Sequence, residues 1–131
     1  MKTQNTEDLL APILKQDPRY TQEAYFFVRE GLDHTVRKLN EVRHISGQEL
    51  LNGIREYALS EFGPVTRRVL SEWGINECID FGHIVFNLVN EGLLGKTEED
   101  SIEDFREGYD FDEAFIQPFR PKNPVSAAAS R

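Results

Sequence analysis

Ser46-Gly47-Gln48-Glu49 is the stretch of sequence that decides the fold, because it marks where the first helix of the central region begins. A serine followed three residues later by a glutamate forms a capping box, in which each side chain bonds the other residue's backbone amide. Apolar residues then recur at helical spacing as far as Phe62, and these are Leu50, Leu51, Ile54, Tyr57 and Ala58. Gly53 interrupts the series, and a glycine inside a helix indicates the close approach of another helix.

Two shorter helices follow, and proline and glycine mark their ends. Pro64 suits the first position of the second helix, and Gly74 ends it. Asn76 is the expected N-cap of the third helix, whose apolar residues include Ile79, Val85, Phe86, Leu88 and Val89. Gly92 ends this helix, and we expect that glycine in the left-handed conformation.

A two-stranded ribbon is expected after the third helix. Residues 93–96 form its first strand, the polar residues 97–101 its tip and residues 105–111 its second strand, where aromatic and polar residues alternate. Three helices followed by such a ribbon resemble a winged helix. The predicted fold class is therefore mainly α (α+β), a winged-helix-like helical domain with a C-terminal β-hairpin wing and two extra N-terminal helices.

A single domain is expected at residues 1–119, followed by a disordered tail at residues 120–131 that is rich in Pro, Lys, Asn, Ser and Ala. Residues 6–44 form the two N-terminal helices, and residues 46–119 form the winged-helix-like body. Thr6 and Thr21 are the expected N-caps of the two N-terminal helices. Pro18 separates these helices, since the residue before a proline avoids the helical conformation.

The chain has 131 residues and a formal net charge of -8, and the charge is unevenly placed. Residues 1–68 hold ten acids and ten bases, whereas residues 69–131 hold thirteen acids and five bases. The second half therefore repels phosphates and attracts basic partners. Cys78 is the single cysteine, and the chain has neither an apolar run of about 20 residues nor a signal-like start. These features favour a cytoplasmic protein without a membrane partner.

The segment from Glu98 to Glu113 is the most distinctive candidate for function, because nine acids lie there among aromatic residues. Aromatic residues with flanking charges suit a protein interface. We therefore predict a small non-catalytic protein-interaction module that acts through an acidic, aromatic-containing wing, with another protein or a second copy in a homodimer as its partner. The residues proposed for this contact are Glu98, Glu99, Asp100, Glu103, Asp104 and Tyr109. The plainer interpretation is that the aromatics pack inward and the acids only keep the protein soluble.

Nucleic-acid binding is the alternative function, since the third helix of a winged helix reads the major groove. His83, Asn87 and Asn90 could bond to bases, but the acids on the same helix would lie beside phosphates without counter-charge. The remaining route is a regulator that uses a basic face on the N-terminal helices. The residues proposed for this face are Arg37, Lys38, Arg43, Arg67 and Arg68.

No catalytic residue, cofactor or metal site is predicted. The three histidines lie on different elements and Cys78 stands alone, so no zinc pattern exists. A single cysteine in a packed helix is usually a small core residue. Arg19, Tyr20, His44 and Asp80 are polar residues in an apolar context, and they form either a site or a structural network. The sequence leaves both open.

Several clusters of residues occur together along the chain. They are Asp17-Pro18-Arg19-Tyr20, Ala24-Tyr25-Phe26-Phe27-Val28, residues 43–51, Trp73-Gly74-Ile75, Asp80-Phe81-Gly82 and the acidic-aromatic residues between Glu99 and Phe111. Over about residues 15–119 they resemble a family of small uncharacterised bacterial proteins of unknown function. The resemblance implies no activity, substrate or site, and it carries only the expectation of a cytoplasmic bacterial protein.

Overall fold

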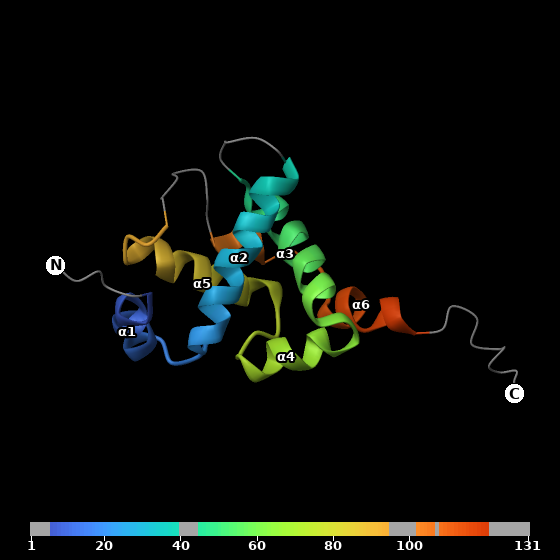
Figure 1. The fold of residues 1–131 in the computed structure, drawn as a ribbon, viewed down its shortest axis with the longest axis horizontal. Helices are drawn as coiled ribbons and strands as arrows, with labels where there is room; N and C mark the ends of the chain where they lie inside the picture. The colour runs from blue at the N-terminus through green and yellow to red at the C-terminus, as the bar shows by residue number, and fades with distance from the viewer. Residues whose placement is uncertain (1–5, 40–44, 95–101, 107, 121–131) are drawn as a thin grey trace, which may run out of the picture.

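The computed structural model describes residues 6–39, 45–94, 102–106 and 108–120, and these residues are helices joined by short connections. The α-helices are α1 (Thr6–Gln16), α2 (Gln22–Leu39), α3 (Gly47–Phe62), α4 (Thr66–Glu72), α5 (Cys78–Asn90) and α6 (Phe111–Phe115). The same described ranges contain three short 3-10 helices, η1 (Gly63–Val65), η2 (Ile102–Phe105) and η3 (Gln117–Phe119). Figure 1 shows α2 and α3 as neighbours at the centre, with α4, α5 and α6 arranged around them.

The pairing of α2 with α3 is the most extensive contact between two elements. The capping box predicted for α3 is present, since Ser46 Oγ accepts from the Glu49 amide and Glu49 Oε1 accepts from the Ser46 amide. Gly53 lies directly against Thr35 of α2, where a Cβ on the glycine would be 1.7 Å from Thr35 Oγ1. The sequence-based prediction of a close helix approach at Gly53 is therefore confirmed.

The core lies between α2, α3 and α5, and shorter elements cover its remaining sides. The largest side chains that are almost completely buried include Tyr25, Phe81, Phe105 and Phe115. Phe105 packs closely over α5 at a glycine, because a Cβ on Gly82 would lie 2.8 Å from Phe105 Cβ. In this way η2 and α6 complete the core from the C-terminal side.

The prediction of a β-hairpin wing and of an α+β class is wrong, because no strand occurs in the residues that the structure describes. Residues 102–105 form η2, and residues 111–115 form α6. Asp110 begins α6 as its N-cap, and its Oδ1 accepts from the amides of Asp112 and Glu113. The alternation of Phe105, Tyr109 and Phe111 thus reflects burial against helices, while residues 95–101 lie outside the described ranges.

The ends of α5 match the sequence-based predictions only in part. Gly92 has φ of 77°, which confirms the left-handed conformation expected after this helix. The N-cap of α5 is Glu77 and not Asn76, and Asp80 Oδ2 accepts from both of their amides. The N-cap predicted for α2 is supported, since Thr21 Oγ1 accepts from the Ala24 amide.

Across the described part of the chain, none of the helices is both long enough and apolar enough to cross a lipid bilayer.

Replacing Gly53 with alanine should destabilise the fold strongly, because the new methyl group would overlap Thr35 and force α2 and α3 apart. We expect the free energy of unfolding, measured by urea denaturation, to fall by about 2–4 kcal/mol. Asn52→Ala, at an exposed neighbouring position of α3, is the matched control and should change it by less than about 0.5 kcal/mol. Equal stability of the two variants would contradict the close contact.

Candidate functional site

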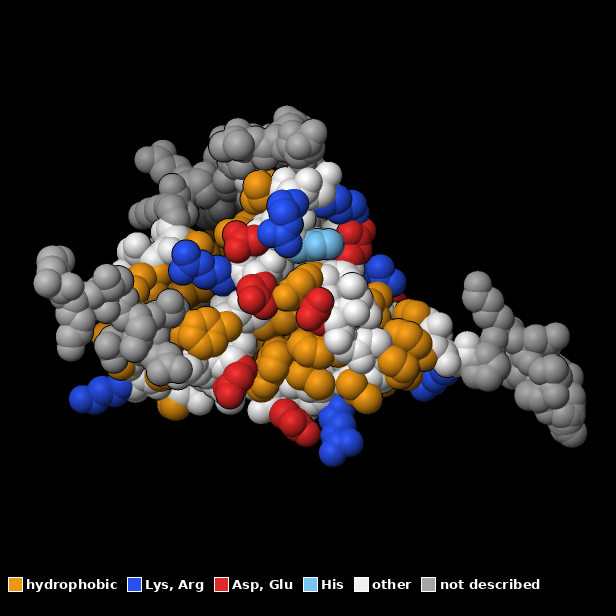
Figure 2. Space-filling model, in the orientation of Figure 1, with side chains coloured by type: hydrophobic (Ala, Val, Ile, Leu, Met, Phe, Trp, Pro, Cys, Tyr) orange, Lys and Arg blue, Asp and Glu red, His pale blue; other side chains and the backbone are white. Residues whose placement is uncertain are grey.

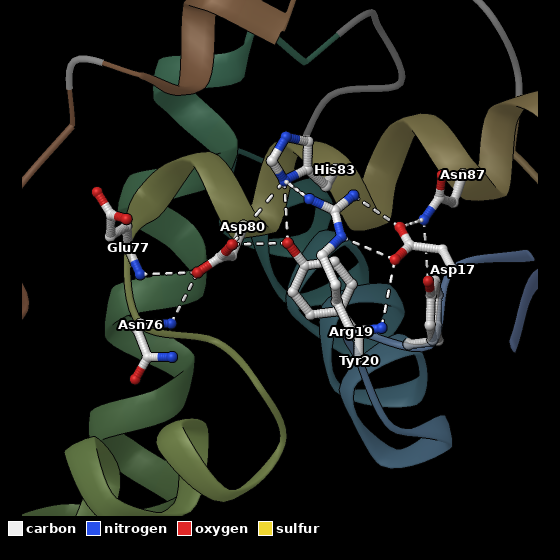
Figure 3. Close-up of polar contacts among 9 residues, drawn as sticks. Asp17, Arg19, Tyr20, Asn76, Glu77, Asp80, His83 and Asn87 are labelled. Carbon is white, nitrogen blue, oxygen red and sulfur yellow. Dashed lines mark hydrogen bonds and ion pairs between the residues drawn. The ribbon is translucent and has the colours of Figure 1, made fainter.

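Polar side chains from α2 and from the turn before it meet polar side chains of α5 in one group, the polar network, whose two halves join where the Arg19 guanidinium lies over the Tyr20 ring. Its members are Asp17, Arg19, Tyr20, Tyr25, Asp80, His83 and Asn87, and Figure 3 shows most of them converging between the two segments. The Tyr20 hydroxyl lies at the centre, 2.6 Å from Asp80 Oδ1 and 2.9 Å from His83 Nδ1. The network therefore joins residues separated by 60 to 70 positions in the sequence.

The single proton of the Tyr20 hydroxyl decides how the network is arranged. It is donated to Asp80, the shorter contact and a carboxylate, so the tyrosine oxygen must accept from His83 Nδ1. Nδ1 of His83 therefore carries a proton. Arg19 Nη1, at 3.4 Å from the same Nδ1, cannot donate to a nitrogen that already carries a proton.

Asp17 connects the second half of the network. Its two carboxylate oxygens accept from Arg19 Nε at 2.7 Å and Arg19 Nη2 at 2.8 Å, a bidentate pair. Asn87 Nδ2 donates both to Asp17 Oδ2 and to the Tyr25 hydroxyl. The guanidinium of Arg19 also lies 5.1 Å from the centre of the Tyr20 ring, so its charge faces both a carboxylate and an aromatic surface.

Backbone contacts hold the turn that carries these residues. Gly74, with φ of 93°, leaves space for the Arg19 carbonyl oxygen, because a Cβ there would lie 2.1 Å from that atom. The Thr21 amide donates to the carbonyl oxygen of Trp73, the residue before Gly74, at 3.2 Å. The loop between α4 and α5 therefore supports the turn through its backbone, while α5 binds it through side chains (Figure 3).

The surroundings of Tyr20 and Asp17 shift the pKa values of both side chains. Burial and the hydrogen bond to Asp80 raise the pKa of Tyr20 far above its usual value, so the hydroxyl stays protonated. The hydrogen bonds from Arg19 hold the pKa of Asp17 well below its usual range. Cys78 offers no nucleophile either, since burial raises the pKa of its thiol to about 11.

A small hollow of about 50 Å³, partly open to solvent, lies beside the network. Its lining residues are Ile13, Gln16, Asp17, Asn87, Asn90 and Glu91. No group of three or more histidine, cysteine or acidic side chains placed to hold a metal ion occurs within residues 6–39, 45–94, 102–106 and 108–120. The hollow is too small for a drug-sized ligand, whose pockets usually measure about 300–1,000 Å³.

A second candidate is an aromatic surface formed by Phe27, Tyr57, Phe62 and Trp73, the aromatic face. The ring centre of Phe27 lies 5.5 Å from that of Tyr57, 5.8 Å from that of Phe62 and 5.6 Å from that of Trp73. Phe27 is buried, whereas the other three side chains are each partly exposed. Figure 2 shows hydrophobic side chains gathered on the face between α2, α3 and α4, with acidic side chains around them.

The residues predicted for partner binding are placed differently from one another. Glu98, Glu99 and Asp100 lie outside the described ranges. Glu103 is exposed and forms an ion pair with Arg106 at 2.7 Å. The Asp104 carbonyl oxygen accepts from the Gln48 side chain.

Tyr109 points inward. Its ring packs against Phe111 and Phe115, and its hydroxyl donates to the Leu51 carbonyl oxygen at 2.8 Å. Burial raises its pKa well above the usual value. The inward packing kept open in the sequence analysis therefore describes Tyr109, which has little surface to offer a partner.

The residues proposed for a basic face fall into two separate pairs. Arg37 and Lys38 lie at the end of α2, whereas Arg67 and Arg68 lie in α4, and Figure 1 shows these places well apart. Three of the four bind acids: Lys38 pairs with Glu56, Arg67 with Asp112 at 3.6 Å and Arg68 with Glu72 at 3.3 Å. Arg43 lies outside the described ranges, and the other four do not form a continuous basic surface.

Of the four polar residues grouped from the sequence, Arg19, Tyr20 and Asp80 come together in the network. His44 lies outside the described ranges. Asp17, Tyr25, His83 and Asn87 are members that were not predicted, although Asp80, His83 and Asn87 follow one another at helical spacing of three and four residues. A polar stripe on an otherwise apolar helix was the signal that could have identified them.

Comparison of the chain with models of protein families, with curated proteins and with solved structures finds no significant match in any of the three. The resemblance to a family of small bacterial proteins therefore stays a prediction, and the arguments about function rest on the chain's own residues.

Tyr20→Phe should destabilise the protein without changing its fold. The substitution removes the donor to Asp80 and leaves the His83 Nδ1 proton without its acceptor. We expect the free energy of unfolding to fall by about 1–3 kcal/mol. Tyr57→Phe is the matched control, because it removes a hydroxyl that donates to the exposed acid Glu30 and should cost less than about 1 kcal/mol. A smaller loss for Tyr20→Phe than for Tyr57→Phe would show that the network does not hold the turn.

The contribution of Asp17 to stability should depend on pH. Because its pKa is lower in the folded protein, Asp17 stabilises the fold above its unfolded pKa of about 3.9, and the contribution is lost as pH falls below that value. At pH 7 we expect Asp17→Asn to lower the free energy of unfolding by about 1–2 kcal/mol, a modest value because Arg19 is largely exposed.

Denaturation of the wild-type protein and of Asp17→Asn between about pH 7 and about pH 2 measures this effect. The difference between their free energies of unfolding should narrow below about pH 4. Asp33→Asn, at an exposed position of α2, is the control and should show no such change. If the difference in free energy of unfolding between wild type and Asp17→Asn stays constant down to the lowest pH, the role given to Asp17 is contradicted.

Proposed function

We propose that this protein is a non-catalytic protein-interaction module and that it contacts its partner through the aromatic face. The observation that carries the proposal is that Tyr57, Phe62 and Trp73 reach the surface side by side around Phe27. Aromatic side chains are enriched in the core of protein interfaces, where they supply large contact areas. The face takes the place of the wing as the proposed contact surface.

Two further features support a contact at this surface. Val65, three residues beyond Phe62 in the chain, is 51% exposed. Large apolar side chains at the surface commonly mark interaction sites when they lie close to one another. Trp73 and Tyr57 also carry polar groups, which suits a surface that is exposed to solvent in the free protein and buried when a partner binds.

Other functions have less support. An enzyme needs an activated nucleophile with a general base beside it. None is offered by the protonated hydroxyl of Tyr20, the ionised Asp17 or the neutral thiol of Cys78. The described basic residues proposed for nucleic acid mostly bind acids, so they leave few cations for phosphates. A cytoplasmic location suits the proposal, since one buried cysteine needs no oxidising compartment.

Photo-cross-linking in the cells that make the protein tests the proposal. A photo-reactive amino acid replaces Glu61, which lies beside the aromatic face, or Glu113 in α6, which serves as the matched exposed control. We expect an adduct with another protein from position 61 and none from position 113. The adduct should disappear when Phe62 is also replaced by serine. Adducts of equal yield from both positions, or none from position 61, would contradict the proposal.

A further inference from the structure

Three exposed glutamates, the acidic rim, border the aromatic face. Glu23 lies one turn before Phe27 on α2, Glu30 lies one turn after it, and Glu61 precedes Phe62 on α3. The Tyr57 hydroxyl donates to Glu30 Oε1 at 2.8 Å, which ties the rim to the face. Among the residues that the structure describes, none of these three glutamates forms an ion pair, and Figure 2 shows acidic side chains around the hydrophobic surface.

Two carboxylates of the acidic rim act on the Tyr57 hydroxyl. Burial, the hydrogen bond to Glu30 and the nearby charges of Glu30 and Glu61 raise its pKa to about 12. Arg37 acts in the opposite direction but does not cancel the effect. A positively charged group that approaches the face therefore gains attraction from carboxylates and from the faces of the aromatic rings.

The negative charge of the acidic rim favours some binding partners of the aromatic face over others. In a symmetric dimer a second copy would bring its own acidic rim against the same surface, and like charges that meet in an interface are costly. A nucleic acid would bring phosphates and would be repelled. A partner segment with basic side chains around apolar ones complements both the aromatic centre and the acidic border.

We propose that the aromatic face binds a short basic amphipathic helix of a partner protein, with its apolar side chains on the aromatic face and its Lys or Arg side chains on the acidic rim. This inference rests on the proposed function and specifies the partner for the same surface.

The spacing of the rim sets the expected spacing of the partner's charges. Glu23 and Glu30 are seven residues apart on one helix, which corresponds to about 10 Å along α2. A helix that lies alongside α2 presents bases at the same separation when they are about seven residues apart, with apolar residues about three and four positions after the first base. Glu61, on α3, borders the aromatic residues from the other helix and can contact a third base.

Fluorescence of Trp73, the single tryptophan, gives a direct readout of this surface. The probe is a synthetic helical peptide without tryptophan that carries Lys at positions i and i+7 and Leu at i+3 and i+4. One control peptide has Glu in place of Lys, and another has the same composition with the lysines moved to the helix face opposite the leucines. We expect a blue shift of Trp73 emission on titration with the first peptide up to about 100 μM, and binding that weakens as salt rises.

Matched protein variants test the rim. Glu30→Gln and Glu61→Gln should each weaken the Kd about two- to fivefold, the effect of a partly exposed charge pair. The amide oxygen introduced by Glu30→Gln can still accept from the Tyr57 hydroxyl, so the fold is retained. Glu91→Gln, an exposed position at the end of α5, should leave the Kd unchanged.

The outcomes separate this inference from the proposed function. The inference is overturned if the acidic or the rearranged peptide binds as tightly as the basic peptide. It is also overturned if the basic peptide binds the Glu30→Gln, Glu61→Gln and Glu91→Gln variants with equal Kd. In both cases the photo-cross-link at position 61, and with it the proposed function, can still stand. If no peptide shifts the Trp73 emission but the cross-linked adduct forms, the inference is overturned and the proposed function stands. Loss of the cross-link itself would overturn the proposed function.

Discussion

The close contact between α2 and α3 is the constraint on which the rest of the structure depends. At Gly53 the two helices approach until Thr35 fills the space that a side chain would need, and at Gly31 a Cβ would lie 2.8 Å from Ile54 Cγ1. Thr35 can be buried there because its hydroxyl donates to the Gly31 carbonyl oxygen one turn earlier. With α2 fixed this closely to α3, Phe27 meets Tyr57 and Phe62, and the turn before α2 is held against α5.

The polar network and the aromatic face occupy different parts of this arrangement and have different physical characters. In the network the key donors have acceptors: Tyr20 donates to Asp80, His83 donates to Tyr20, and Arg19 donates to Asp17. A network satisfied in this way fixes the position of a loop and leaves little reactivity. On the aromatic face, partly exposed rings lie beside carboxylates that form no ion pair with any described residue. That difference is why we propose a structural role for the polar network and a binding role for the aromatic face.

Local signals in the sequence predicted the helices that correspond to α1–α5, the capping box at Ser46, the close approach at Gly53 and the end of α5 at Gly92, because each depends on residues near one another in the chain. The wing was wrong because an alternation of aromatic residues also arises where a short 3-10 helix and a short α-helix bury side chains, and Asp110 starts α6. Part of the network was grouped by its polarity. The aromatic face was missed because Phe27 and Trp73 come from elements other than α3, which carries Tyr57 and Phe62, and no local spacing indicates that they meet.

The most direct test of the account is to map the contact surface by NMR of the labelled protein, titrated with the basic amphipathic peptide. The account predicts that the Trp73 indole N–H signal and the amides around Phe27, Tyr57 and Phe62 move together with increasing peptide, while amides of α6 and of the turn that carries Tyr20 stay unchanged. Changes centred on α6 or on the polar network, with a stationary Trp73 signal, would contradict the claim that the aromatic face is the binding surface.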